Sequence, residues 1–284
     1  MLTIFFHRKE LQFHAKPERP DPMYAKKLQE ILGGQFGEIS VAMQYLFQGW
    51  NARGDERYKD LIMDTGTEEL GHVEMISTMI ARLLDDAPVN EQEKAAEDPV
   101  IGAIMGGMNP HHAIVSGLGA MPENSTGVPW SGGYIVASGN LITDLRANLN
   151  AESQGRLQVA RLYEMTDDRG VKEMLSFLLA RDTMHQNQWI AALKELEEEH
   201  GTTVPSSVPK EWEATDFSYD LLNFSEGEES KEGSWTSGKT PDGEGEFGYV
   251  KEPQAHGGKQ ELKPAPSYMH GTPPKKKEKS GIFK

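Results

Sequence analysis

The sequence predicts an all-α fold built on a four-helix bundle, and three observations carry this prediction. Apolar side chains recur every three or four residues along four long segments, which is the period of one helix face. Short turns join the first segment to the second and the third to the fourth, whereas a long glycine-rich segment separates the two pairs. The chain has 284 residues, which is enough for a bundle and an additional segment.

The first helix is predicted over residues 23–50. The chain enters it through Asp21, a capping side chain, and Pro22, which suits the first helical position. Three glycines between residues 33 and 37 interrupt the pattern, and each costs about 1 kcal/mol relative to alanine in a helix interior. We therefore expect another part of the protein to approach the backbone closely at these glycines.

Three more helices follow, predicted over residues 55–84, 135–165 and 171–198, and Gly201 closes the last one. The glycine-rich connection at residues 98–137 contains Pro110, Pro122 and Pro129, and we expect it to be ordered, with room for one short helix. Two helical hairpins joined by a long crossover form a ferritin-like four-helix bundle.

The predicted domain organisation has three parts: an N-terminal arm at residues 1–21, the bundle at residues 22–201 and a C-terminal arm at residues 202–284. The last part is rich in glycine, proline, serine and charged residues, which is not a core-forming composition. It is either a disordered tail or an extended arm that becomes ordered on another subunit. Five aromatic residues favour the arm over most of its length: Trp212, Tyr219, Trp235, Phe247 and Tyr249.

Charge and composition exclude several classes of function. The formal net charge is −15, which argues against nucleic-acid binding and favours a small neutral or cationic substrate. The chain has no cysteine, so thiolate metal sites and cysteine nucleophiles are excluded. No apolar stretch approaches the length of a membrane span, and the N-terminus lacks a signal-peptide pattern. We expect a cytoplasmic protein with no membrane partner.

The candidate metal ligands begin with two acid-x-x-His motifs. Glu69 and His72 lie three residues apart on one face of the second helix, and Asp182 and His185 repeat the spacing on the fourth. A single motif of this kind is more often an ordinary solvated helix face than a metal site.

The first and third helices strengthen the metal-site interpretation. Glu38 and Glu152 lie among small and apolar neighbours, 34 residues before His72 and 33 residues before His185 respectively. Each hairpin therefore places a glutamate opposite an acid-x-x-His motif. Four helices that agree in this way predict a di-metal carboxylate site inside the bundle.

Buried carboxylates repel one another and remain ionised only beside compensating charge, which two divalent cations would supply. Oxygen and imidazole donors without sulfur suit manganese or iron. Asp182 is one methylene shorter than a glutamate and reaches a metal less easily. If Asp182 stays outside the ligand shell, it could hydrogen-bond a metal-bound water and relay protons as a catalytic group.

Residues 33–45 and 66–74 closely resemble the manganese catalases, and residues 148–152 and 182–185 fit the same family. The resemblance covers roughly residues 1–200. It implies disproportionation of hydrogen peroxide to water and dioxygen at two manganese ions per subunit, which alternate between the divalent and trivalent states.

The resemblance also implies residue roles. Glu69 would bridge both ions, Glu38 and His72 would complete one ion, and Glu152 and His185 would complete the other. Tyr45 matches a tyrosine that hydrogen-bonds the carboxylate shell and is a second catalytic candidate, although an ordinary core tyrosine is the alternative interpretation. Some members carry a basic residue beside the third-helix glutamate. Position 151 is alanine here, which leaves Arg156 as the substitute.

Some family members bind a structural calcium between subunits. Asp60, Asp64, Asn223 and Ser225 resemble its ligands, and oxygen-only ligands fit calcium. An acidic helix face and an ordinary turn are the alternative. The family forms hexamers, so the resemblance implies a homohexamer. The remaining histidines lack ligand spacing and are expected to be surface or structural residues: His7, His14, His111, His112, His200, His256 and His270.

Three other functions stay open from the sequence. A di-iron ferroxidase or oxidase would use the same bundle and ligand types. A catalase-like structural protein of a spore coat would keep the bundle for assembly, although such a relative is expected to lose ligands, and here the full set is present. Metal storage is the third, but no cage-forming element is apparent.

Overall fold

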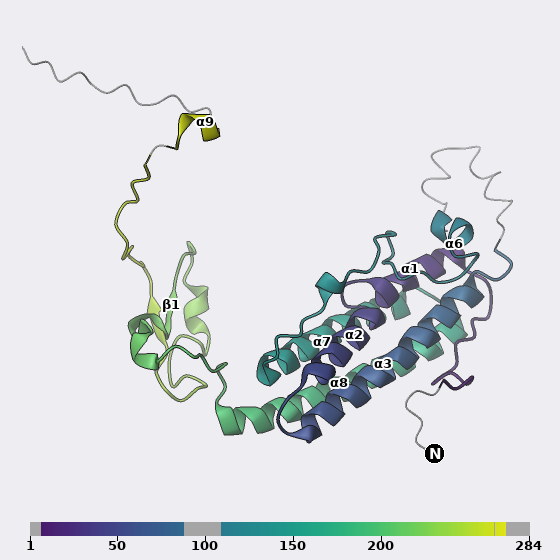
Figure 1. Ribbon diagram of the computed structural model, residues 1–284, viewed down its shortest axis with the longest axis horizontal. Coiled ribbons are helices and arrows are strands. Elements are labelled where there is room, and N and C mark those ends of the chain that lie inside the picture. Colours follow the sequence, from purple (N-terminus) through teal and green to yellow (C-terminus); the bar gives the residue numbers. More distant parts are fainter. Residues whose placement is uncertain (1–6, 88–108, 264, 271–284) are drawn as a thin grey trace, which may run out of the picture. The chain divides into compact units, whose positions relative to one another are not determined.

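The computed structural model describes residues 7–87, 109–263 and 265–270. Two antiparallel helical hairpins form its main body, and Figure 1 shows their helices packed side by side. Their members are α2 (Glu38–Asn51) with α3 (Glu56–Leu83), and α7 (Leu141–Glu164) with α8 (Arg169–His200). The prediction of a four-helix bundle is confirmed.

The predicted first helix is wrong in its continuity, because two helices occupy its range. α1 (Pro22–Gly33) ends where the crossover passes, and a Cβ added to Gly33 would collide with the backbone of Glu123. The expectation of a close approach is therefore confirmed at Gly33, whereas the nearest atoms at Gly34 and Gly37 belong to α1 itself. α2 begins at Glu38, so this carboxylate lies in the first turn of a helix, where the helix dipole favours negative charge.

The third predicted helix begins later than expected, at Leu141 rather than Ile135. Gly139 has a φ of +79°, and the Asn140 side chain accepts a hydrogen bond of 2.9 Å from the Thr143 amide. This turn and cap fix the start of α7. α1 begins as predicted, since Asp21 accepts a 2.9 Å hydrogen bond from the Tyr24 amide. The crossover contains α6 (Pro110–Ile114) and η1 (Gly132–Tyr134).

Two apolar clusters fill the bundle, one toward each end. The first includes Ile76 and Leu178, and the second includes Ile62 and Trp189, all at most 1% exposed. Complete burial of such a side chain stabilises the fold by about 1.5–3 kcal/mol. The polar pairs Glu69 and His72 on α3, and Asp182 and His185 on α8, lie between the two clusters in sequence. The bundle therefore carries a polar layer between two apolar ones.

The described residues from position 206 onward form a second compact unit. Its two strands, β1 (Asp220–Leu222) and β2 (Gly248–Val250), pair in parallel. The Tyr219 ring packs against the backbone at Gly245, which leaves no space for a side chain there. The short helices of this unit are η2 (Lys210–Trp212), η3 (Thr215–Phe217), η4 (Glu229–Glu232) and α9 (Ser267–His270).

Among the helices that the structure describes, none has an apolar stretch long enough to cross a lipid bilayer.

Candidate metal centre

The polar layer of the bundle brings together six of the residues singled out from the sequence. They are contributed by all four helices of the two hairpins, and none is more than 8% exposed. These residues are Glu38, Glu69, His72, Glu152, Asp182 and His185.

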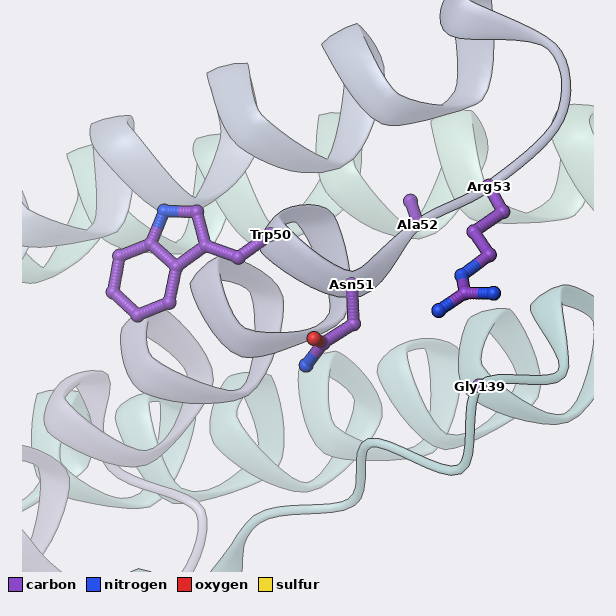
Figure 2. Close-up of a pocket in the computed structure, with 5 residues that line it drawn as sticks. All are labelled: Trp50, Asn51, Ala52, Arg53 and Gly139. Atoms are coloured by element: carbon purple, nitrogen blue, oxygen red, sulfur yellow. The ribbon is translucent and has the colours of Figure 1, made fainter.

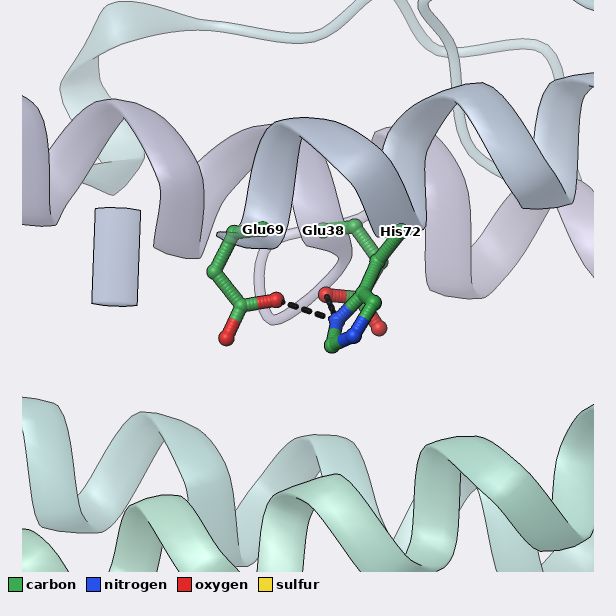
Figure 3. A group of neighbouring side chains, drawn as sticks. All are labelled: Glu38, Glu69 and His72. Carbon is green, nitrogen blue, oxygen red and sulfur yellow. Dashed lines mark hydrogen bonds and ion pairs between the residues drawn. The ribbon is translucent and has the colours of Figure 1, made fainter. Parts of the chain in front are cut away.

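The first hairpin supplies one group of possible ligands. The Nδ1 atom of His72 lies 2.6 Å from Oε2 of Glu69 and 3.6 Å from Oε2 of Glu38. Figure 3 shows the three side chains pointing from α2 and α3 toward the interior of the bundle. One nitrogen and two carboxylate oxygens therefore converge on one place.

The second hairpin supplies a matching group that shares a member with the first. The Nδ1 atom of His185 lies 2.8 Å from Oε1 of Glu69 and 3.5 Å from Oε1 of Glu152. Within each group the possible ligand atoms lie within 4.8 Å of one another. Glu69 thus presents one oxygen to each group, which is the geometry of a carboxylate between two neighbouring metal positions.

The chemistry of these side chains fits a pair of divalent cations. Burial and the negative charge of Glu69 raise the pKa of Glu38 well above its usual range. Burial also raises the pKa of Glu152. Bound cations would supply the missing positive charge and keep these carboxylates ionised. Oxygen and imidazole nitrogen donors without sulfur suit manganese or iron.

Asp182 belongs to neither group of ligand atoms. Its Oδ2 is buried and has no hydrogen-bond partner within residues 7–87, 109–263 and 265–270. Burial, followed by the charges of Glu152 and Glu69, raises the pKa of Asp182 to about 8. A carboxyl group with such a pKa can hold or release a proton near neutral pH.

Tyr45 lies fully buried beside the second group. Its hydroxyl donates a hydrogen bond of 2.5 Å to Oε1 of Glu152, the oxygen that faces His185. Burial and the charge of Glu152 raise the pKa of Tyr45 well above its usual range, so the phenol stays protonated and donates. The ring packs edge-on against Trp189, with centroids 5.2 Å apart.

Sequence reasoning missed Glu68 and Arg181, which contact each other beside the two imidazoles. Nε of Arg181 donates to Oε1 of Glu68 at 2.5 Å. Although burial acts to raise it, the proximity of His185 and the hydrogen bonds from Arg181 lower the pKa of Glu68 to about 2. In the sequence, charged residues beside the two acid-x-x-His motifs are indistinguishable from an ordinary solvated helix face. The only hint of a role for Glu68 is that it directly precedes Glu69.

Arg156, the basic substitute suggested for position 151, donates hydrogen bonds to α8. It donates to the Leu179 carbonyl and, at 2.8 Å, to Oγ1 of Thr183. Among the described arginines, Arg181 is the one that reaches a carboxylate bordering both imidazoles.

The candidate calcium ligands divide between the two units of the chain. Asp60 and Asp64 are exposed on α3. In the second unit, Oδ1 of Asn223 accepts a 2.9 Å hydrogen bond from the Ser225 amide, as in an ordinary turn. Of the other histidines, His112 is fully buried with Nε2 3.2 Å from Oε1 of Gln29, consistent with a structural role.

A surface pocket lies where the end of α2 comes near the start of α7 (Figure 2). Its lining is formed by Trp50, Asn51, Ala52, Arg53 and Gly139. None of the candidate metal ligands lines it, so the convergent carboxylates and imidazoles, rather than this hollow, mark the functional site.

The fold and the site define a four-helix-bundle protein of the di-metal carboxylate class. The sequence profile of manganese-containing catalases matches residues 4–281. The chain belongs to this family, so the family and the enzyme class predicted from the sequence are confirmed.

Individual relatives agree along nearly the whole chain. A manganese catalase of Bacillus subtilis is 74% identical over 95% of this chain and 99% of its own length. A manganese catalase of Lactiplantibacillus plantarum is 50% identical over 94% of this chain and 98% of its own length. The crystal structure of KatB, a manganese catalase from Anabaena, superposes with a TM-score of 0.71 at 27% identity, covering 88% of this chain and 100% of that one.

Proposed function

We propose that this chain disproportionates hydrogen peroxide to water and dioxygen at two manganese ions per subunit. Glu38 and His72 would hold one ion, Glu152 and His185 would hold the other, and Glu69 would serve both. The observation that carries the proposal is the pair of ligand groups that share Glu69, which offers one oxygen to each. When bound, the manganese pair supplies the two-electron redox chemistry that peroxide disproportionation requires.

The side chains around the ligands hold the protons and positions that this reaction needs. Asp182 is buried beside the ligands with an unpartnered Oδ2, and we assign it the transfer of protons to and from peroxide and water. Tyr45 holds the Glu152 carboxylate in place through its hydroxyl. The apolar clusters on both sides of the polar layer exclude bulk water from it.

Assembly and location form a finer part of the proposal. We place the enzyme in the cytoplasm as a homohexamer, with a calcium ion bound at Asp60 and Asp64 of one subunit and Asn223 and Ser225 of another. Exposed apolar side chains on the bundle support self-association, because association would bury them. Sedimentation of the purified protein with and without a calcium chelator tests the hexamer and the calcium together.

The first experiment measures metal content by plasma mass spectrometry and oxygen evolution from peroxide on the same purified sample. Two manganese ions per chain with oxygen evolution support the proposal. Iron in their place, with oxidation of ferrous iron and little oxygen evolution, would favour the ferroxidase. An intact fold that takes up no metal would favour a structural role such as that of a coat protein.

A further inference from the structure

Two consecutive glutamates of α3 each face both imidazole rings. Glu69 lies on the Nδ1 side of the rings, and Glu68 lies on the Nε2 side. The two oxygens of Glu69 face the Nδ1 atoms of His72 and His185, at 2.6 and 2.8 Å. The two oxygens of Glu68 face the Nε2 atoms of the same rings, at 3.7 and 3.3 Å. The rings themselves lie 6.0 Å apart between their centroids, inclined at 30°.

The Nε2 atoms need an acceptor. A neutral imidazole that offers the Nδ1 lone pair to a metal carries its hydrogen on Nε2. Both Nε2 atoms are buried, and neither completes a hydrogen bond within the described part of the chain. A buried donor without a partner costs free energy, and the Glu68 carboxylate is the acceptor group that faces both of them.

Hydrogen bonds from Arg181 and Gln12 hold the Glu68 carboxylate in this position. Arg181 on α8 donates from Nε to Oε1 at 2.5 Å and from Nη2 to Oε2 at 3.1 Å, a two-point contact that fixes the plane of the carboxylate. Gln12 of the N-terminal segment adds a 3.2 Å hydrogen bond to Oε1. The Glu68 side chain is 20% exposed, so it closes the polar layer toward solvent while Glu69 lies inside.

We propose that Glu68 is a positioning residue that accepts the Nε2 hydrogens of His72 and His185 together, turning both Nδ1 atoms toward the metal pair. Arg181 orients Glu68 for this role. The inference rests on the ligand assignment proposed above. Because a single carboxylate serves both rings, loss of its charge weakens the grip on both ions, whereas loss of Glu38 or Glu152 affects one ion directly.

The test compares Glu68→Gln and Arg181→Gln with the unmodified protein, all loaded with manganese. The measurements are the rate of manganese release to excess EDTA and the electron paramagnetic resonance spectrum of the divalent manganese pair. For Glu68→Gln we expect release about 10–100-fold faster, as for other partners of metal-binding histidines, together with an altered spectrum. Arg181→Gln should change both in the same direction by a smaller factor.

Glu74→Gln is the matched control, because Glu74 lies on the same helix and contacts His7 at the surface. It should leave both the release rate and the spectrum unchanged. In the double variant Glu68→Gln/Arg181→Gln, the release rate should match that of Glu68→Gln alone, because Arg181 acts only through Glu68.

Unchanged release and an unchanged spectrum in Glu68→Gln, with the fold retained, would overturn the inference. If Glu68→Gln does not fold, Arg181→Gln decides by the same two measurements. An unmodified protein that binds no manganese would instead contradict the proposed function, so the two failures are distinguishable.

Discussion

The two hairpins of the bundle repeat one arrangement of a glutamate opposite an acid-x-x-His motif, but the acid of that motif differs between them. The first supplies Glu38, Glu69 and His72, and the second supplies Glu152, Asp182 and His185. Glu69 and Asp182 occupy the same place relative to their histidines. Glu69 contacts both imidazoles, whereas Asp182 contacts neither and keeps an oxygen without a partner.

Under the proposed assignment, one methylene group separates two functions. The longer side chain of Glu69 reaches both ligand groups, as a shared ligand would. The shorter side chain of Asp182 stops outside these groups, where the proposal gives its carboxyl group the exchange of protons. A symmetric pair of bridging glutamates would leave no such group, so the asymmetry between the hairpins has a function in the proposed reaction.

The largest expected effect comes from removing the bridge. Glu69→Gln keeps the size of the side chain but removes the charge that both ions share. We expect loss of bound manganese and oxygen evolution at the background rate, measured by mass spectrometry and an oxygen electrode. Glu173→Gln, at an exposed α8 position paired with Arg169, is the control and should retain both. Two tightly bound ions in Glu69→Gln would show that the hairpins do not share a bridge.

Asp182→Asn tests the other side of the comparison. If Asp182 only moves protons, the variant keeps manganese, and kcat falls by about 10²–10⁴-fold, the usual contribution of a positioned acid–base group. Metal content and steady-state oxygen evolution measure the two quantities separately. Loss of metal from Asp182→Asn would instead make Asp182 a ligand and the hairpins equivalent.

Tyr45→Phe should have a smaller effect, confined to the second hairpin. It removes the 2.5 Å hydrogen bond to Glu152, and a hydrogen bond to a charged group contributes about 1.5–3 kcal/mol. We expect oxygen evolution to fall by about tenfold, with the fold retained. Tyr58→Phe is the matched control, since Tyr58 donates to Glu195 away from the centre. Equal losses in the two variants would contradict a specific role for Tyr45.

The smallest effect concerns the folding stability of the metal-free protein and how this stability depends on pH. The folded state raises the pKa of Asp182 to about 8, so the folded chain binds a proton more tightly than the unfolded chain does. The stabilising contribution of that proton is complete below the ordinary pKa of about 4 and is lost as the pH rises to about 8.

Asp182→Asn has no such proton, so the metal-free variant should gain in Tm over the metal-free unmodified protein by a few degrees between pH 5 and pH 8. Differential scanning calorimetry across this range measures the gap. A gap that narrows with rising pH would contradict a buried carboxyl group that resists ionisation.

Helical periodicity was sufficient to predict the bundle and the faces that carry Glu69, His72 and His185, because spacing along a helix determines direction. The interruption of the helix between Gly33 and Glu38 was not predictable, because its cause is the crossover backbone at Glu123, 90 residues from Gly33 in sequence. The glycines gave a local signal, but they did not identify what approaches them.

The part of the site formed by Glu68 and Arg181 could not be predicted for a related reason. Their contact joins α3 to α8, more than 100 residues apart, and neither residue belongs to a spaced motif. Asp182 and Tyr45 were singled out in advance, Asp182 by the length of its side chain and Tyr45 by the family resemblance. The unpartnered Oδ2 of Asp182 and the choice of Glu152 as the partner of Tyr45 required the structure.

The proposed ligands extend along the chain from residue 38 to residue 185, and this span would give a bound metal pair a second consequence. Two ions that tie four helices together act as a crosslink, and part of their binding free energy becomes free energy of folding. The abundance of the protein would then follow the supply of manganese. In a cell starved of the metal, proteolysis of opened chains would remove the enzyme itself as well as its activity.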